Sequence, residues 1–174
     1  MQRAETRRQD PPKSGTYTID TQASTVRFRT RSVFGLFPVH GTFGLARGSV
    51  VVAEPAEASA VEATLHADAF DSGLRRRDEH VRSADYLDAA RHPEILFRST
   101  GLRRHGRGAV LNGRLTVRGV TRAVDVEVRE IAAEGRRLTA RGTAVVDRYD
   151  FGLTKAKGMT GRRLVIELEI SASR

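Results

Sequence analysis

The sequence predicts an all-β protein whose strands are antiparallel and close into a barrel. Apolar and polar residues alternate with a period of two in many short stretches, which is the pattern of a strand with one buried and one wetted face. The breaks between the later stretches are short and contain glycine, and tight turns join antiparallel neighbours because parallel strands need long crossovers. About eight such strands are enough to close a barrel around one ligand, while a filled two-sheet sandwich is the alternative.

The N-terminal half contains candidate strands near residues 17–19, 25–30, 39–43, 49–53 and 61–67. Within the second of these, Val26 and Phe28 face one side of the sheet while Arg27 faces the other. The stretch RSVFGLFP interrupts the alternation because it holds too many Phe and Gly residues for a simple strand.

The second half of the chain, from Glu94 onward, predicts an up-and-down meander. Its breakers lie near Gly106, Gly119 and Gly135, and each is short enough for a hairpin between antiparallel strands. The apolar positions that alternate with polar ones in these strands are Ile95, Phe97, Leu115, Val117, Val124, Val126, Val128, Leu164, Ile166, Leu168 and Ile170.

The one long connection of the chain contains the charged stretch RDEHVRSADYLD. Asp71 or Ser72 is predicted to cap a helix that starts near Leu74. Leu74, Val81 and Ala84 fall on one side of this helix, which predicts an apolar face. We expect the excursion to lie across one end of the barrel as a plug or a side wall.

A second short turn is expected directly after this helix. Ser83 has the residue type of an N-cap, and the turn runs through Tyr86 and Leu87. Pro93 then favours extended backbone before the next strand. The helical segment therefore covers about residues 72–90.

The composition indicates one soluble domain that needs no covalent staples. A chain of 174 residues can bury a sizeable core. It contains no cysteine, which excludes a disulfide scaffold and thiol catalysis. We expect residues 1–14 to form a disordered lead-in and residues 15–174 to form a single domain. Because the lead-in has no apolar run long enough for a signal peptide, we expect a cytoplasmic protein.

The net charge of +9 comes almost entirely from arginine, because lysine occurs only at positions 13, 155 and 157. This balance indicates either an anionic partner or an arginine-rich solvated surface. A nucleic-acid groove would need continuous positive charge with exposed aromatic residues between the cations. Successive turns alternate between the barrel ends and split the arginines into two groups, which argues against such a groove: Arg103, Arg104, Arg136 and Arg137 at one end, and Arg118, Arg122, Arg148, Arg162 and Arg163 at the other.

The motifs of several enzyme classes are absent from the sequence. No G-x-S-x-G, G-x-G-x-x-G or P-loop occurs, so the serine-hydrolase elbow and the nucleotide cradles are missing. His66 and Asp68 share one face of a strand without a third ligand at a recognisable spacing, and we expect no metal site. One alternative function is a hydrolase-like enzyme in which His80 works with Asp78 or Glu79 as an acid–base pair. Another is an arginine-rich module that binds an acidic partner.

The residues that face inward carry the main functional prediction. Each one alone is most simply a core residue. Together they are medium and small apolar side chains, in a chain with only 6% aromatic residues, and they are too small to fill a closed sheet of this size. The sequence therefore predicts an interior suited to a long apolar guest.

Three separate blocks of the chain carry a family resemblance: RRRDEHVRSADYLDAARHPEILFRST, LTVRGVTRAVDVEV and DRYDFGL. Together they resemble the YceI-like family of polyisoprenoid-binding proteins. The first is similar to the family's Asp-x-His-hydrophobic-Arg-Ser-x-Asp segment, which is followed by a His-Pro pair and an Ile-x-Phe strand. The resemblance covers most of the chain from Tyr17 onward.

The resemblance implies an extended antiparallel lipocalin-like β-barrel of about eight strands, with the helical segment packed at one end. It implies that the interior binds and carries a long-chain amphiphile, such as an isoprenoid quinone, a polyprenyl phosphate or a fatty acid or amide. Catalysis and any cofactor other than the bound lipid are not expected, and neither is a nucleic-acid partner. Transient membrane contact through the basic barrel ends and a homodimer are left open. The lining residues implied by position are Val26, Phe28, Phe34, Phe37, Phe43, Leu65, Ile95, Phe97, Leu115, Val117, Val126, Phe151, Leu153, Ile166 and Leu168.

The resemblance also identifies Asp78, His80, Arg82 and Ser83 as the family's charged helix block. We expect these residues to form a local hydrogen-bonded lock on the helix rather than a headgroup site. The reason is that Asp and Arg four residues apart on a helix naturally pair.

The chain departs from the family pattern at two expected barrel ends. Ala23 and Arg31 stand beside the second strand where relatives often have histidine. Gly161-Arg162-Arg163 stands before the last strand in place of Gly-Asp-Glu. The resemblance therefore implies no particular headgroup.

Overall fold

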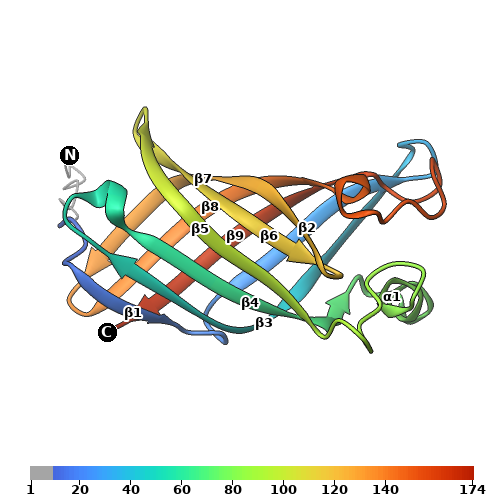
Figure 1. Cartoon of the computed structure of the whole chain (residues 1–174), viewed down its shortest axis with the longest axis horizontal. Helices are drawn as coiled ribbons and strands as arrows, with labels where there is room; N and C mark the ends of the chain where they lie inside the picture. The colour runs from blue at the N-terminus through green and yellow to red at the C-terminus, as the bar shows by residue number, and fades with distance from the viewer. Residues whose placement is uncertain (1–9) are drawn as a thin grey trace, which may run out of the picture.

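The computed structural model describes residues 10–174, which form nine β-strands, one α-helix and two short 3₁₀ helices (Figure 1). Residues 1–9, the first part of the expected lead-in, lie outside the described residues. The strands are β1 (Gly15–Ile19), β2 (Thr25–Ser32), β3 (Phe37–Val52), β4 (Ala60–Asp71), β5 (Glu94–His105), β6 (Gly108–Val117), β7 (Val120–Glu134), β8 (Arg137–Asp147) and β9 (Arg163–Ser173). The helices are η1 (Ala56–Ala58), α1 (Arg75–Arg82) and η2 (Arg148–Phe151).

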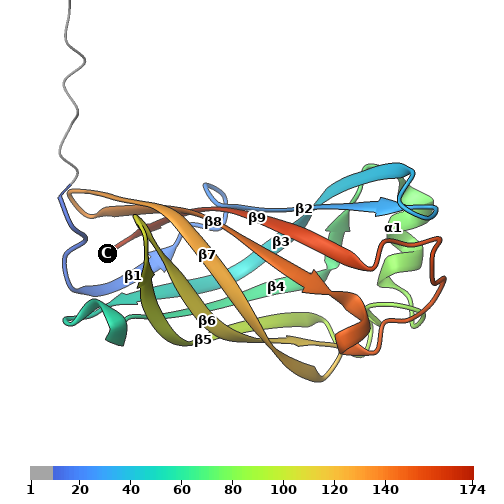
Figure 2. The ribbon, with the colours of Figure 1, turned by 90° about the horizontal axis from the view of Figure 1, so that it is seen from above.

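The sheet closes on itself, which confirms the predicted barrel and excludes the alternative of a two-sheet sandwich. Its strand order is β1-β3-β2-β9-β8-β7-β6-β5-β4, and β3 also pairs with β4. Eight strands, β2 to β9, therefore form a closed antiparallel ring. The two views in Figures 1 and 2 show this ring as an elongated barrel with α1 at one end, here called the helical end.

Strands β1 and β2 together occupy one strand position of the barrel, between β3 and β9. β1 pairs with the last part of β3 and the end of β9, whereas β2 pairs with the first part of β3 and the start of β9. Ser24 and Ser171 bond across the break between β1 and β2. The Ser24 hydroxyl donates to the Ser171 carbonyl at 3.2 Å and accepts from the Ser171 amide at 2.9 Å. The amide and the carbonyl of Ser171 therefore both have hydrogen-bond partners, although the strand ladder is interrupted here.

The strands expected at residues 39–43 and 49–53 are a single strand, β3, so predicting two strands there was wrong. Register shifts lie between Thr42 and Gly44 and between Leu45 and Arg47 where β3 pairs with β4. Such bulges bend a long strand and change which face its side chains point to. A Cβ at Gly44 would lie 2.5 Å from the Cβ of Ala69, so the bend needs glycine at this position.

The meander from Glu94 onward is confirmed, because β5, β6, β7, β8 and β9 pair in chain order. Its tight turns contain Gly106, Gly119 and Gly135, whose φ angles are 57°, 72° and 59°. These left-handed conformations favour glycine because a side chain there is strained. Successive turns alternate between the two ends of the barrel (Figure 2).

The helix is where the sequence predicted but both its cap and its apolar face differ from the prediction. Its N-cap position is Leu74, which makes no side-chain cap hydrogen bond. Leu74 is 51% exposed and Ala84 is exposed, but the third residue of the predicted face, Val81, packs against the buried cluster, and the fully buried residue of α1 is Asp78. A helix of eight residues is marginal by itself in water, so α1 depends on the contacts that anchor it to the rest of the fold.

The turn after the helix carries the apolar plug. Tyr86, Leu87 and Ala89 are buried in this turn, and the Tyr86 amide donates to the Ser83 carbonyl at 3.0 Å. Leu87 and Ala89 belong to the same buried cluster as strand residues of the barrel. The expected plug at one barrel end is therefore present, but residues 83–92, here called the closing segment, provide it instead of α1.

Candidate functional site

The inner wall of the barrel can be read from the strand register, because directly opposed residues of neighbouring strands point to the same face. Val26 pairs with Leu168 and Phe28 with Ile166. The strand residues predicted to line the interior share this face, and they are Val26, Phe28, Phe43, Leu65, Ile95, Phe97, Leu115, Val117, Val126, Ile166 and Leu168.

Four predicted lining residues lie outside the strands or at their ends. Two of them are buried and two are exposed. Phe151 and Leu153, in and after η2, are buried in the cluster at the helical end. Phe34 and Phe37 lie in and after the β2–β3 turn and are 78% and 59% exposed. The structure therefore does not bring Phe34 and Phe37 together with the inner wall, because the turn carries them beyond the rim of the barrel.

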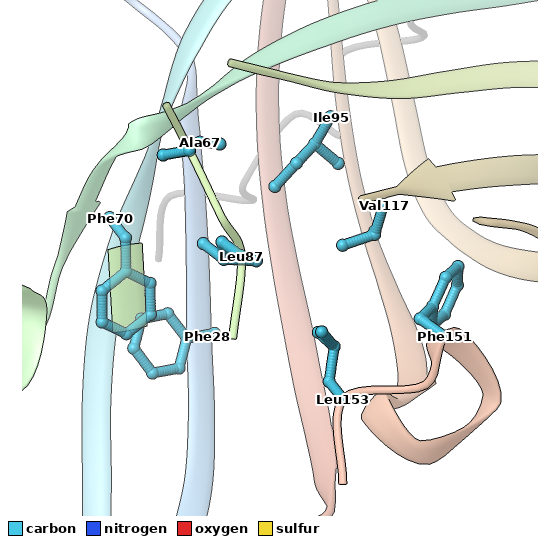
Figure 3. Packing of buried hydrophobic residues seen from close by; sticks show 9 residues of the cluster. Phe28, Ala67, Phe70, Leu87, Ile95, Val117, Phe151 and Leu153 are labelled. Atoms are coloured by element: carbon cyan, nitrogen blue, oxygen red, sulfur yellow. The ribbon is translucent and has the colours of Figure 1, made fainter. Parts of the chain in front are cut away.

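The interior is densely packed at the helical end. Phe28 stacks on Phe70 with ring centroids 4.9 Å apart, and Phe43 contacts both rings at 5.4 Å and 5.3 Å. Figure 3 shows Phe28 and Phe70 on one side of this cluster and Leu87 beside them, with Ile95, Val117, Phe151 and Leu153 on the other side. This end of the barrel is closed by apolar contacts from η2 and the closing segment.

The opposite end has its own small buried cluster. Tyr17, Ile19, Leu138 and Ala172 are each 5% exposed or less and pack together. The Tyr17 hydroxyl donates to the Lys13 carbonyl at 2.9 Å, which satisfies the one polar group of this cluster. Both ends of the barrel are therefore packed by its own side chains.

The middle of the barrel has a third buried cluster, made of Leu111, Val126 and Ala144. Phe97, Val124, Ile166 and Leu168 pack against this cluster and point inward by register, yet they are only partly buried. In a closed sheet, accessible surface on an inner face opens onto the interior of the barrel. These side chains therefore keep accessible apolar surface on the inner wall.

Small residues lie on the inner wall of this middle region. Gly113, Gly142 and Ala144 all face inward, by pairing with Val124, Leu168 and Ile166. A Cβ at Gly113 would lie 2.4 Å from the Phe97 ring. The edge of this ring thus occupies the space that a side chain at Gly113 would take.

The charged helix block forms a hydrogen-bonded lock, though not through the expected Asp78–Arg82 pair. Asp78 Oδ1 accepts from the amide and the hydroxyl of Ser72 at 2.9 Å and 2.6 Å. Arg82 donates instead to the Phe70 carbonyl at 2.7 Å. Each of these bonds ties the helix to the end of β4, the strand that precedes it, and not to itself.

His80 does not form the acid–base pair considered from the sequence. Its Nε2 lies 2.9 Å from Asp85 Oδ2, and its side chain is 55% exposed. The hydrogen bond with His80 lowers the pKa of Asp85, with Lys155 contributing a smaller effect in the same direction. Asp78 and Glu79, the partners considered in that alternative, are bonded to Ser72 and Arg75, so neither of them pairs with His80 in the structure.

Other chemistry is sparse over residues 10–174. No three His, Asp or Glu side chains gather there into a potential metal site. A hollow on the outer wall is lined mostly by polar residues, among them Arg27, Arg129, Arg141 and Glu167, although Gly142 and Leu168 also contribute to its lining. None of the described helices is long and apolar enough to cross a membrane.

Sequence reasoning missed several residues of the interior. Phe70 and Leu87 belong to the helical-end cluster, and Val124 packs against both this cluster and the central wall. Val124 had a signal, because it continues the alternation of β7. Phe70 and Leu87 had none, since a register shift precedes one and the other stands in an irregular turn.

A closed antiparallel barrel with an apolar inner wall and a plug at one end defines a lipocalin-like protein. Residues 17–172 match the YceI-like domain family. The chain therefore belongs to the YceI-like family, as its three sequence blocks indicated.

Comparison with individual relatives supports this assignment. The chain is 34% identical to a UPF0312 protein of Ectopseudomonas mendocina over 168 residues, which covers 91% of this chain and 87% of the relative. It is 29% identical over 163 residues to Protein YceI of Salmonella arizonae, with 89% and 84% covered.

Solved structures of other proteins share the fold. Burkholderia cenocepacia BcnA superimposes with a TM-score of 0.79 at 23% identity, covering 89% of this chain and 99% of that protein. A polyisoprenoid-binding domain from Saccharophagus degradans, implicated in plant cell wall breakdown, superimposes with a TM-score of 0.67 at 13% identity, covering 90% and 97%.

Proposed function

We propose that this protein binds and carries a long-chain amphiphile in the middle of its barrel, without catalysis and without a cofactor. The observation that carries the proposal is the set of inward-facing apolar residues that stay partly exposed inside a closed sheet, among them Phe97, Leu115 and Ile166. An apolar chain laid along these residues would cover the surface that they leave open. The polyisoprenoid-binding domain with the same fold supports an isoprenoid as the guest.

The energetics favour a long guest over a small one. Each methylene transferred from water to an apolar site contributes roughly 0.8 kcal/mol before ordering costs. The inner wall presents few polar groups that would fix the orientation of a compact ligand, so affinity has to come from chain length. Isoprenoid quinones, polyprenyl phosphates and fatty acids or amides all meet this requirement.

The placement of His80 supports a carrier more than an enzyme. Its imidazole is half-exposed and bonded to Asp85, and none of the inward-facing residues named above is a general acid or base. A hydrolase would need such a group beside the guest.

The direct test is to extract the purified protein with organic solvent and identify any co-purified lipid by mass spectrometry. Titration with an apolar fluorophore then measures occupancy of the barrel. Protein that carries no amphiphile and does not enhance the emission of the fluorophore would contradict the proposal.

A tryptophan placed in the middle of the barrel should block the guest. We expect Val124→Trp to reduce fluorophore binding at least tenfold, because Val124 faces inward and is only partly buried, and the larger side chain would occupy the space of several methylenes. The matched control is Ala123→Trp, one residue away and exposed on the outer face, which should bind as the wild type does. Equal binding by both variants would place the fluorophore outside the barrel.

A further inference from the structure

Four large apolar side chains project together at the helical end of the barrel. Phe34, Leu36, Phe37 and Met159 are 78%, 70%, 59% and 51% exposed. They come from the β2–β3 turn and from the loop between η2 and β9, which lie side by side beyond the rim in both views (Figures 1 and 2). We call these four residues the apolar tip.

The two loops of the tip are joined by backbone hydrogen bonds. The Val33 amide donates to the Met159 carbonyl at 2.9 Å, and the Phe34 amide donates to the Gly158 carbonyl. The Phe34 ring packs so closely on Gly158 that a Cβ there would lie 2.5 Å from it. The tip is therefore a built structure of two loops and not a single strand end.

The backbone of the tip holds its side chains outward in a costly conformation. Val33 and Phe34 have φ angles of 49° and 54°, in the left-handed region that β-branched and aromatic residues rarely adopt. Strain of this kind persists only where surrounding contacts fix the backbone, and here the bonds from the Val33 and Phe34 amides do so. Phe34 is exposed and does not belong to the buried cluster of Phe28 and Phe70.

Positive charge surrounds the tip. Residues 31–38 and 154–163 contain Arg31, Lys155, Lys157, Arg162 and Arg163 and no carboxylate. Carboxylates outside these loops pair with three of the five: Asp147 lies 2.8 Å from Arg162 and 3.9 Å from Arg163, and Asp85 lies 4.0 Å from Lys155. Two of the three lysines of the chain are in the second of these loops, and lysine keeps its ammonium group at a polar interface while its stem lies on apolar material. An apolar tip with cationic side chains beside it matches a bilayer whose surface carries anionic headgroups.

We propose that the apolar tip inserts into the surface of an anionic lipid bilayer and docks the helical end of the barrel there. A stable protein partner needs a surface of about 800 Å² on each side, whereas the tip is a narrow projection of two loops. A bilayer needs no complementary shape. Docking at this end would bring the closing segment, which covers the barrel interior, to the membrane. That docking there serves the transfer of a guest rests on the proposed function.

The test is co-sedimentation of the protein with vesicles of phosphatidylcholine mixed with phosphatidylglycerol, and with pure phosphatidylcholine vesicles. We expect binding to the mixed vesicles that falls at high salt, because surface charges are screened. The double variant Phe34→Ser/Leu36→Ser should lower the partition coefficient at least tenfold, since burying one such side chain is worth about a factor of ten or more. The control Val145→Ser, an apolar residue 59% exposed on the outer wall, should bind as the wild type does.

A charge variant tests the contribution of the two lysines separately. Lys155→Gln/Lys157→Gln should weaken binding to the mixed vesicles about 25-fold, because each of the two cations contributes roughly a factor of five near an anionic surface. Unchanged binding of the Phe34→Ser/Leu36→Ser variant would overturn the proposal. The proposal would also be overturned if sedimentation velocity shows that the wild type is a dimer and that the Phe34→Ser/Leu36→Ser variant is a monomer. The tip would then be an interface between two copies of the chain.

The outcome separates docking from cargo binding. Val124→Trp should bind vesicles normally while losing the fluorophore, and Phe34→Ser/Leu36→Ser should take up the fluorophore normally in the absence of vesicles. A wild type that binds vesicles through the tip but no fluorophore would refute the proposed carrier and leave the docking surface in place.

Discussion

At the scale of the residue, Arg148 differs most from its predicted role as a surface charge at a barrel end. It is 5% exposed, and its guanidinium donates to the carbonyls of Gly161 at 2.8 Å, Thr160 at 3.1 Å and Leu153. The planar fork of arginine can reach several carbonyls at once. Arg148 therefore ties the loop between η2 and β9, which carries part of the apolar tip, to the barrel.

Replacing Arg148 should destabilise the protein strongly. We expect Arg148→Met to cost about 3 kcal/mol of unfolding free energy in urea, because three carbonyls lose their donor. Arg148→Lys should recover only part of this cost, since one ammonium group cannot match the fork. Arg104→Met is the control, with a side chain that is 81% exposed and an expected change within about 0.5 kcal/mol. A similar small change for Arg148→Met would show that water satisfies the carbonyls.

At the scale of the element, α1 acts as a clamp for the closing segment. Its buried residue Asp78 bonds back to Ser72, and Arg82 bonds to the Phe70 carbonyl at the end of β4. The clamp positions Leu87, which packs into the helical-end cluster. The short polar helix α1 thus holds in place the apolar residues of the closing segment, which follows it in the sequence.

Removing the Asp78 carboxylate should loosen the plug. Asp78→Ala is expected to cost about 2 to 3 kcal/mol, because hydrogen bonds to a charged acceptor are stronger than neutral ones. Amide exchange in the closing segment should become faster, and release of a bound fluorophore should accelerate with it. The neighbouring Glu79→Ala changes only an exposed pair with Arg75, and we expect about 0.5 kcal/mol or less. Unchanged exchange in Asp78→Ala would mean that the apolar contacts alone hold the segment.

At the scale of the whole molecule, the two rings Phe28 and Phe97 differ in burial along the inner wall of the barrel. Phe28, at the helical end, is 3% exposed and stacked on Phe70. Phe97, in the central wall, is only partly buried and lies on Gly113. The two rings face the same interior, so comparing them measures how the packing varies along the barrel.

Truncation of these two rings should have unequal costs. We expect Phe28→Ala to lower the unfolding free energy by about 3 to 5 kcal/mol, the usual penalty in a filled core, and Phe97→Ala by roughly half of that, because part of its surface is already open. Chemical denaturation of both variants, with any co-purified lipid removed first, measures the difference. Equal losses would mean that the middle is as full as the end, and the carrier function would lose its structural basis.

Much of the barrel was predictable because strand patterns are local. The alternation at Leu115 and Val117, or at Ile166 and Leu168, assigned these residues to the inner face correctly, since neighbouring side chains of a strand point to opposite faces. Alternation split β3 in two, since the bulges of this strand shift the pattern. Phe34 and Phe37 were placed on the lining by the family resemblance and not by alternation, and that placement failed because apolarity alone does not distinguish a buried side chain from one at an exposed tip.

The sequence by itself determined the class of fold, the meander of the second half and the inner faces of the regular strands, since these follow from side-chain alternation and turn chemistry over a few residues. Only the tertiary structure decided that Arg148 is buried, that Leu87 plugs the barrel in place of the helix, and that Phe28 is packed tightly while Phe97 is not. The physical reason is that burial depends on contacts between segments far apart in the chain, and no local pattern records which segment arrives to cover a given side chain.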